Sequence, residues 1–249
     1  MTSIQKMRDR NIFIPDPNIP YKLSRSKLED FTRCPRCFYL DRRLGVNRPS
    51  IPSFNLNSAV DTLFKKEFDI HRARGTKHPL MEHYKINAVP FQHPKMDIWR
   101  ENFQGIQVHH PLSNFIVTGA IDDIWVTPDN QLHVVDYKST ATEKGIDMDG
   151  MYKDGYKRQI EIYQWLLRAS GFNVSDIGYF VYANGRTDRK AFDGKLEFDI
   201  EIFPYTGNSG WVEDALLKAR DCLESNTIPD SDPTCELCTY RQESRKVEQ

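Results

Sequence analysis

Two apolar stretches in the middle of the chain predict the centre of the fold. Residues 114–126 (NFIVTGAIDDIWV) and 131–139 (QLHVVDYKS) are rich in β-branched and aromatic side chains, which favour strands. The short segment between them, residues 127–130 (TPDN), contains turn-forming residues. The pattern therefore predicts a β-hairpin.

Helical patterns surround this hairpin. Ser24 or Ser26 can cap a helix that runs to Arg33, and a second short helix is expected to end at Gly45. A third helix is expected over residues 57–72, because its apolar side chains recur at helical spacing. These side chains are Val60, Leu63, Phe64 and Phe68.

The second half of the chain alternates helices and strands. Residues 152–170 and 210–225 show helical spacing, whereas DIGYFVYA and LEFDIEIFPY are typical of strands. Residues 75–105 are irregular apart from a helix expected near 96–103. The sequence therefore predicts an α/β fold, a mixed central β-sheet flanked by helices. We expect an N-terminal arm over residues 1–20 and a single domain over residues 21–249.

Composition and charge limit the possible functions. The chain has 249 residues, of which 39% are hydrophobic and 28% charged, as in ordinary globular proteins. No stretch approaches the roughly 18 apolar residues of a membrane span, and the opening residues lack the apolar run of a secretory signal. We therefore expect a cytoplasmic protein with no membrane partner.

A net charge of −1 means that any attraction to nucleic acid must come from a local excess of positive charge. The segment from Lys22 to Arg48 has eight basic and three acidic residues. It can serve as a contact surface for nucleic acid or be merely a solvated helix face.

The hairpin brings ionisable side chains together. If its loop is residues 128–130, Asp122 lies opposite Asp136, and Lys138 lies on the same face two residues further on. Two facing carboxylates repel each other unless a cation lies between them, and carboxylates suit Mg²⁺ bound near phosphate. Lys138 could then position or deprotonate the attacking water. Alternatively, Asp136 and Lys138 form an edge-strand charge pair, and a loop of even length would place Asp123 opposite Asp136.

Three segments resemble the successive motifs of RecB-like PD-(D/E)XK nucleases, including CRISPR-associated exonucleases. They are Gly119-Ala120-Ile121-Asp122, Val134-Val135-Asp136-Tyr137-Lys138 and Gln159-Ile160-Glu161-Ile162-Tyr163. The segment LSRSKLEDFTRCPRCFYL is similar to the family's N-terminal S-x-S-x-L…CP-x-x-F/Y pattern, so the resemblance spans residues 23–240.

This resemblance implies a restriction-endonuclease-like core and a function. Asp122 and Asp136 would bind Mg²⁺ or Mn²⁺, Lys138 would be catalytic, and Gln159 and Tyr163 would support the site or contact DNA. The implied protein is a deoxyribonuclease, an exonuclease of DNA repair, recombination or defence, acting on single- or double-stranded DNA.

The third helix departs from the family pattern. Relatives often have a metal-binding histidine where this chain has Ser58-Ala59-Val60-Asp61. Asp61 is the expected replacement as a metal ligand, and Glu67 is a weaker candidate. Without a replacement, the chain would be a catalytically degenerate DNA-binding protein that keeps the nuclease fold.

Two C-x-x-C pairs predict a metal centre. Cys34 and Cys37 lie near one end of the chain and Cys235 and Cys238 near the other, and four thiolates suit Zn²⁺ or an iron–sulfur cluster. Relatives with a cluster have one N-terminal and three C-terminal cysteines, and Cys37 replaces the missing fourth ligand here. The resemblance favours a 4Fe–4S cluster, with Zn²⁺ as the alternative. The centre would clamp residues 21–48 and 226–249 into an accessory region of the nuclease core. A purely structural zinc protein would leave the hairpin carboxylates unexplained.

Overall fold

The computed structural model describes residues 10–49, 54–149 and 153–248. Residues 1–9 of the expected arm lie outside these ranges. The chain forms two compact units. One contains residues 1–51, 108–118 and 210–249, and the other contains residues 52–107 and 119–209.

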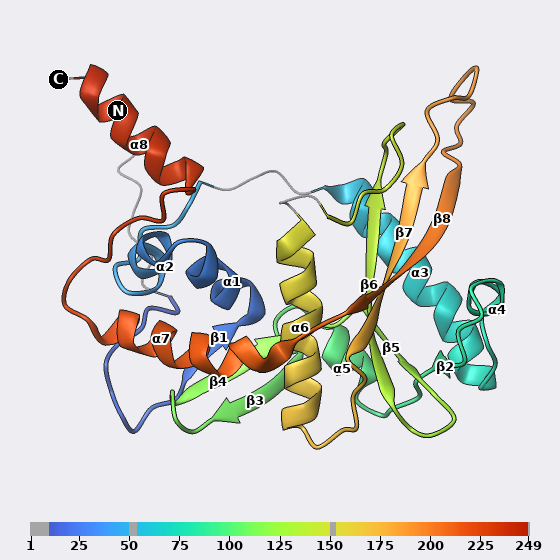
Figure 1. Cartoon of the computed structure of the whole chain (residues 1–249), viewed down its shortest axis with the longest axis horizontal. Helices are drawn as coiled ribbons and strands as arrows, with labels where there is room; N and C mark the ends of the chain where they lie inside the picture. Colours follow the sequence, from blue (N-terminus) through green and yellow to red (C-terminus); the bar gives the residue numbers. More distant parts are fainter. Residues whose placement is uncertain (1–9, 50–53, 150–152, 249) are drawn as a thin grey trace. The chain divides into compact units, whose positions relative to one another are not determined.

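A five-stranded mixed sheet forms the centre of the second unit (Figure 1). Its strand order is β2-β5-β6-β7-β8, and β6 pairs in parallel with β7, whereas the other neighbours are antiparallel. The expected mixed α/β fold is therefore confirmed. The strands are β2 (Val89–Pro90), β5 (Asp123–Val126), β6 (Leu132–Thr140), β7 (Ile177–Gly185) and β8 (Phe198–Thr206).

Two long helices cover opposite faces of this sheet. Helix α3 (Asn55–Arg74) packs Phe64 and Phe68 against the face that carries Val135 and Tyr137. Helix α6 (Asp154–Ala169) covers the other face, where a Cβ atom on Gly178 would lie 2.7 Å from Ile160 Cγ2. Such close packing requires glycine. Two short helices, α4 (Pro79–His83) and α5 (Met96–Arg100), belong to the same unit.

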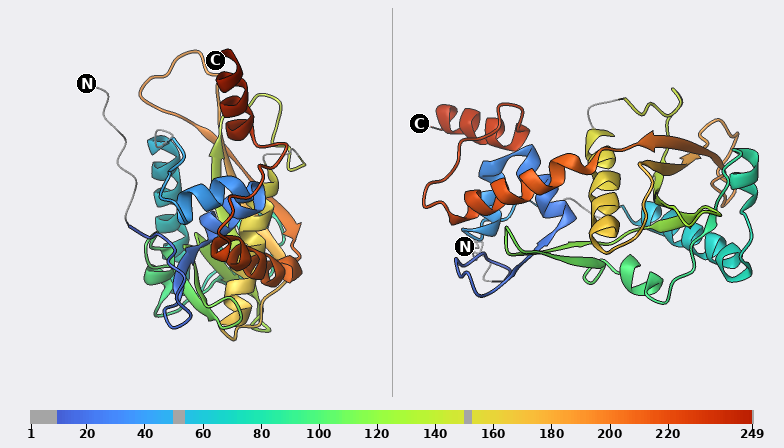
Figure 2. Two further views of the ribbon diagram at one scale, coloured as in Figure 1. Left: turned by 90° about the vertical axis from the view of Figure 1, so that its left-hand side faces the viewer. Right: turned by 60° about the horizontal axis from the view of Figure 1, so that its bottom comes forward.

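The first unit combines a small sheet with helices. Strands β1 (Tyr21–Ser24), β4 (Phe115–Gly119) and β3 (Ile106–His110) form a sheet in the order β1-β4-β3, and the boundaries between the units fall within β3 and β4. Helix α7 packs against α1 and α2, as both views in Figure 2 show. The helices are α1 (Arg25–Arg33), α2 (Pro35–Arg42), α7 (Val212–Glu224) and α8 (Glu236–Val247).

Three details of the expected fold are wrong. Residues 114–126 do not form one strand, because the chain breaks between β4 and β5 and the Ile121 amide donates to the Trp99 carbonyl oxygen at 3.0 Å. Leu63 is 62% exposed, so the buried stripe of α3 does not include it. Strand β1 was not expected at all, because the pattern there indicated only a helix cap. In the part of the chain that the structure describes, no helix has the length and apolar character needed to cross a membrane.

Candidate active site and metal centre

The register of the β5–β6 hairpin places two aspartates side by side. Ile124 pairs with Val134 and Asp123 with Val135, as expected for a loop with an odd number of residues. Asp122 lies just before β5, and the backbone amide of Tyr137 donates to its Oδ2 atom at 3.1 Å. The carboxylate of Asp122 is thus held beside Asp136.

Asp136 is completely buried. Its Oδ1 atom accepts a hydrogen bond from Gln159 Nε2 at 2.8 Å, so α6 contributes directly to the site. Its Oδ2 atom lies against the Lys138 ammonium and forms an ion pair with it. A buried carboxylate is costly unless it meets a cation.

Asp61 is brought to the same site by α3. The ammonium nitrogen of Lys65 lies 2.8 Å from Asp61 Oδ2 and 3.2 Å from Asp122 Oδ1, so it bridges the two carboxylates. Glu67, in contrast, forms an ion pair with His78 at 2.9 Å, which makes it a poor substitute for the missing histidine. The sequence analysis did not identify Lys65 as part of the site.

The charges in this site depend on one another. Burial and the neighbouring Asp122 charge raise the pKa of Asp136 to about 7, despite the opposing effect of Lys138. Burial also raises the pKa of Asp122, but Lys138 and Lys65 outweigh it, so that this pKa is below its ordinary value. Burial lowers the pKa of Lys138, yet the two carboxylates keep it above its ordinary value. Lys138 is therefore an ammonium ion when the site holds no metal.

Gln159 and Tyr163 lie one turn apart on α6, as expected. Gln159 Nε2 is 3.3 Å from Tyr163 Oη, and both residues are buried. The Tyr163 ring lies so close to Gly119 that a Cβ atom there would be 2.6 Å from Cε1. Tyr163 therefore packs α6 against the segment Gly119-Ala120-Ile121-Asp122, and Gln159 holds Asp136.

A buried network behind the site was missed by the sequence analysis. Asp123 is fully buried and accepts hydrogen bonds from Arg72, from Arg100 at 3.2 Å and from the Tyr137 hydroxyl at 2.6 Å. Arg100 also donates to the backbone oxygen of Asp122 at 3.0 Å. The network thus fixes the backbone that presents Asp122. Its only sequence signal is the pair of arginines, which lie far from the hairpin.

Four cysteines meet in the first unit. Their sulfur atoms all lie within 4.8 Å of one another, and no other group of at least three His, Cys, Asp or Glu residues in the described ranges does so with its ligand atoms. Three of the Sγ–Sγ distances are 3.5, 3.7 and 3.9 Å. The four cysteines are Cys34, Cys37, Cys235 and Cys238.

Both C-x-x-C pairs lie at helix starts. Cys34 is the N-cap of α2 and Cys235 the N-cap of α8, so the second cysteine of each pair falls in the first turn. The positive end of a helix dipole favours thiolates. The four residues could therefore bind a metal ion.

The basic segment from Lys22 to Arg48 is partly neutralised within itself. Lys27 forms ion pairs with Asp30 at 2.7 Å and Asp41 at 2.8 Å, and Arg48 pairs with Asp30 at 3.2 Å. A proposal of nucleic-acid binding therefore cannot depend on the total charge of this segment.

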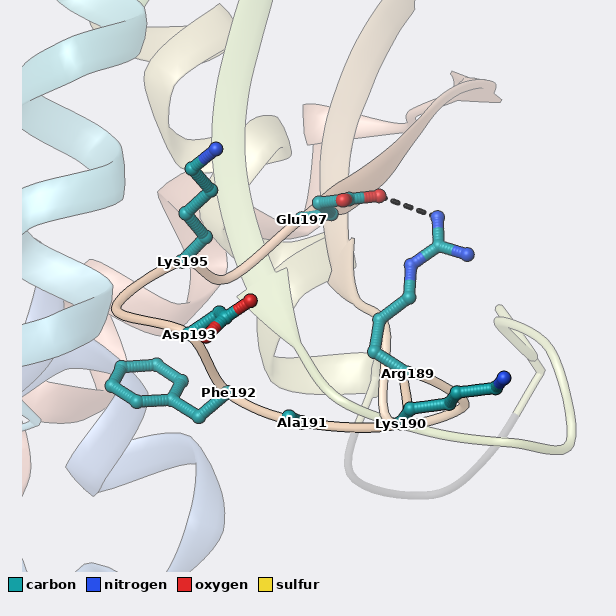
Figure 3. Close-up of a pocket in the computed structure, with 7 residues that line it drawn as sticks. All are labelled: Arg189, Lys190, Ala191, Phe192, Asp193, Lys195 and Glu197. Carbon is teal, nitrogen blue, oxygen red and sulfur yellow. Dashed lines mark hydrogen bonds and ion pairs between the residues drawn. The ribbon is translucent and has the colours of Figure 1, made fainter.

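A hollow at the tip of the β7–β8 hairpin is lined by residues 189–197 alone (Figure 3). Arg189 forms an ion pair with Glu197 across it. A single loop builds this hollow, and Asp61, Asp122 and Asp136 do not line it. We therefore place the candidate active site at Asp136 and not at this hollow.

Comparisons with known proteins show the family to which the chain belongs. A family model described as the PD-(D/E)XK nuclease superfamily matches residues 57–242, a range that excludes Cys34 and Cys37. A crystal structure of a protein named SSO0001 has 15% sequence identity and a TM-score of 0.34, with 87% of this chain and 82% of that chain covered. No curated protein matches the chain.

Replacement of Asp123 is expected to destabilise the protein strongly. Asp123→Ala removes the buried carboxylate that Arg72 and Arg100 share and leaves them only the more exposed Asp69, and breaking a buried ion pair typically costs about 3–5 kcal/mol. Urea denaturation followed by circular dichroism measures the loss. Asp188→Asn is the control, because it breaks only an exposed pair with Arg186 and should cost less than about 1 kcal/mol. Equal losses in the two variants would contradict the importance of the network.

Proposed function

Because this chain belongs to the PD-(D/E)XK nuclease superfamily, we propose that it is a divalent-metal-dependent deoxyribonuclease with Asp136 at the centre of its active site. The observation that carries the proposal is the state of Asp136. It is buried beside a second carboxylate, its pKa is raised to about 7, and it forms an ion pair with the Lys138 ammonium. Such an arrangement is costly for a structural residue and suits a metal ligand.

The residues present fit a hard divalent ion. Asp122 and Asp136 offer carboxylate oxygens, Asp61 is held near them by Lys65, and Mg²⁺ or Mn²⁺ prefers such ligands. A bound ion of this kind supplies a Lewis acid for the phosphate and lowers the pKa of water. The fit to oxygen ligands also explains how the site can dispense with the histidine that relatives often use.

Lys138 and Gln159 perform different tasks in this proposal. The Lys138 ammonium, which the two carboxylates keep protonated, stabilises negative charge that develops on the phosphate and orients the attacking water. Gln159 donates to Asp136 Oδ1 and so fixes the orientation of the carboxylate that would bind the metal ion. Tyr163 keeps α6, and with it Gln159, in place.

We assign DNA as the substrate and exonucleolytic cleavage as the mode from the resemblance to RecB-like and CRISPR-associated nucleases. The resemblance includes the N-terminal segment with Cys34, which the family model does not reach. Repair, recombination or defence are the processes in which such an enzyme would act, in the cytoplasm. A catalytically degenerate DNA-binding protein is the alternative outcome of the activity test below.

We further propose that the four cysteines hold one zinc ion rather than a 4Fe–4S cluster. A tetrahedral ion with Zn–S bonds of about 2.3 Å separates its sulfur ligands by roughly 3.8 Å. Three of the six separations, at 3.5, 3.7 and 3.9 Å, agree with that value, and all four sulfur atoms lie within 4.8 Å of one another. A cluster must fit four irons and four sulfides between its thiolates, which therefore lie farther apart. Zinc would tie α2 to α8 within the first unit.

Loss of Asp136 or Lys138 should abolish most cleavage. Asp136→Asn removes a metal ligand, and Lys138→Gln should slow cleavage about 10²–10³-fold, as expected when one group that stabilises transition-state charge is removed. The assay uses end-labelled single- and double-stranded DNA and an equivalent RNA, with and without Mg²⁺ or Mn²⁺.

The matched controls for this assay are Asp214→Asn and Lys218→Gln, which alter an exposed ion pair on α7. Circular dichroism checks that every variant is folded. Unchanged cleavage by the Asp136 and Lys138 variants would contradict the assignment, and DNA binding without any cleavage by the native protein would support the degenerate alternative.

Asp61→Asn should weaken metal binding without abolishing cleavage. The substitution removes one charged oxygen ligand and should raise the Mn²⁺ concentration for half-maximal rate roughly 10-fold, which corresponds to about 1.4 kcal/mol. Glu67→Gln is the control, because Glu67 lies on the same helix but pairs with His78. Identical metal titrations for the two variants would mean that the site is built without Asp61.

The cysteine centre should contain about one zinc ion per chain. Protein purified without oxygen should be colourless, and Cys37→Ser or Cys238→Ser should lose the zinc and lower the melting temperature. Cys222→Ser is the control, because Cys222 is a fifth cysteine outside the cluster and should keep the metal. Elemental analysis and a visible spectrum provide the readout. Brown protein that contains iron would contradict the zinc proposal.

A further inference from the structure

A second ammonium group lies beside the candidate active site, among tyrosines. Lys153 Nζ donates to the Tyr182 hydroxyl at 2.7 Å and lies 4.6 Å from the centre of the same ring. It also lies 5.4 Å from the centre of the Tyr156 ring. Lys138 Nζ is 4.8 Å from that ring, so the Tyr156 ring is shared by Lys153 and the lysine of the active site.

Three elements of the second unit bring these groups together. Lys138 on β6 pairs in parallel with Tyr182 on β7, so both side chains project from the same face of the sheet. Lys153 is the N-cap residue of α6, and Tyr156 lies in the first turn of this helix. The cluster is therefore fixed by the same strands and helix that place Asp136 and Gln159.

Lys153 differs from the other lysines of this region in having no carboxylate partner. Lys138 pairs with Asp136, and Lys65 pairs with Asp61 and Asp122, but no acidic group among the described residues forms an ion pair with Lys153.

The electrostatic setting of Lys153 favours an additional anion. Burial lowers the pKa of Lys153 and Lys138 lowers it further, whereas Asp147 opposes the shift. An anion bound beside the ammonium would stabilise its charged form. The tyrosine rings around Lys153 attract its charge but cannot neutralise it.

We propose that Lys153, with Tyr156 and Tyr182, forms a subsite for a phosphate of the nucleic-acid strand next to the phosphate that is cleaved. This inference rests on the proposed nuclease function and deepens it. Lys153 donates to a phosphate oxygen, and the buried Tyr182 hydroxyl, which accepts a hydrogen bond from Lys153, holds the ammonium group in position. The Tyr156 ring lies near both Lys153 and Lys138, so the subsite adjoins the candidate active site.

The test compares Lys153→Gln with Lys153→Arg and Lys77→Gln. Lys77 is the matched control, because it also lacks a carboxylate partner and donates only to Asn87 at 2.9 Å. It follows α3 at the end away from Asp61. Binding of a labelled oligonucleotide is measured in buffer without added divalent ion, over a series of salt concentrations. Cleavage by the same variants is measured in Mg²⁺.

Loss of one phosphate contact should reduce the slope of log K against log salt by about 0.7–0.9. We expect this change for Lys153→Gln, together with a rise in KM of roughly 3–10-fold that exceeds the fall in kcat. Lys153→Arg should keep the native slope, because the positive charge remains, and Lys77→Gln should match the native protein.

Each other outcome is decisive. If the native protein cleaves DNA but Lys153→Gln keeps the native slope and KM, the subsite is rejected and the nuclease function stands. If the native protein binds the oligonucleotide without cleaving it, the proposed nuclease function is rejected. The salt slopes of the variants then decide alone whether the subsite exists. If the native protein neither binds nor cleaves, both proposals fall.

Discussion

The site depends on the burial of negative charge at two consecutive residues, Asp122 and Asp123. Consecutive residues of an extended chain point in opposite directions, so the two carboxylates enter different surroundings. Asp123 enters the core, where two arginines and the Tyr137 hydroxyl neutralise it and hold the backbone rigid. Asp122 reaches the opposite side, where Lys65 and the Tyr137 amide hold it beside Asp136. Asp123, in the buried network, and Asp122, in the candidate active site, are therefore neighbours along the chain. Tyr137 contacts Asp123 through its hydroxyl and Asp122 through its backbone amide.

The sequence predicted the parts of the site that depend on local geometry. Strand alternation and an odd loop fix the register of the hairpin, which is why Asp122, Asp136 and Lys138 were expected on one face. The i, i+4 spacing of Gln159 and Tyr163 likewise fixes their common face on α6. The four cysteines were also expected to lie together. This expectation came from chemistry and not from local geometry, because two distant C-x-x-C pairs can bind one metal centre only if they lie side by side.

The parts that escaped prediction depend on contacts between distant segments. Arg72 and Arg100 belong to α3 and α5, and nothing in their local pattern shows that they share the carboxylate of Asp123. The rotation of α3 was also misjudged. The sequence pattern counted Leu63 among the apolar residues of the buried face and so placed this face too far toward Leu63. In the structure, Phe64 and Phe68 mark the centre of the buried face, and Lys65 points at Asp122. The break at Ile121 follows from its hydrogen bond to Trp99, which strand propensity cannot reveal.

The charge balance of the site has a consequence for metal binding. Three carboxylates face two lysines, and Lys65 bridges Asp61 and Asp122 at the positions where a divalent ion would bind. In the proposed function, an ion that took Asp122 as a ligand would compete with Lys65 for this carboxylate. The unusual Asp61 and Lys65, one helical turn apart, therefore act as a pair. Asp61 holds Lys65 beside Asp122, and in the proposed function it would also offer an oxygen ligand to the metal ion.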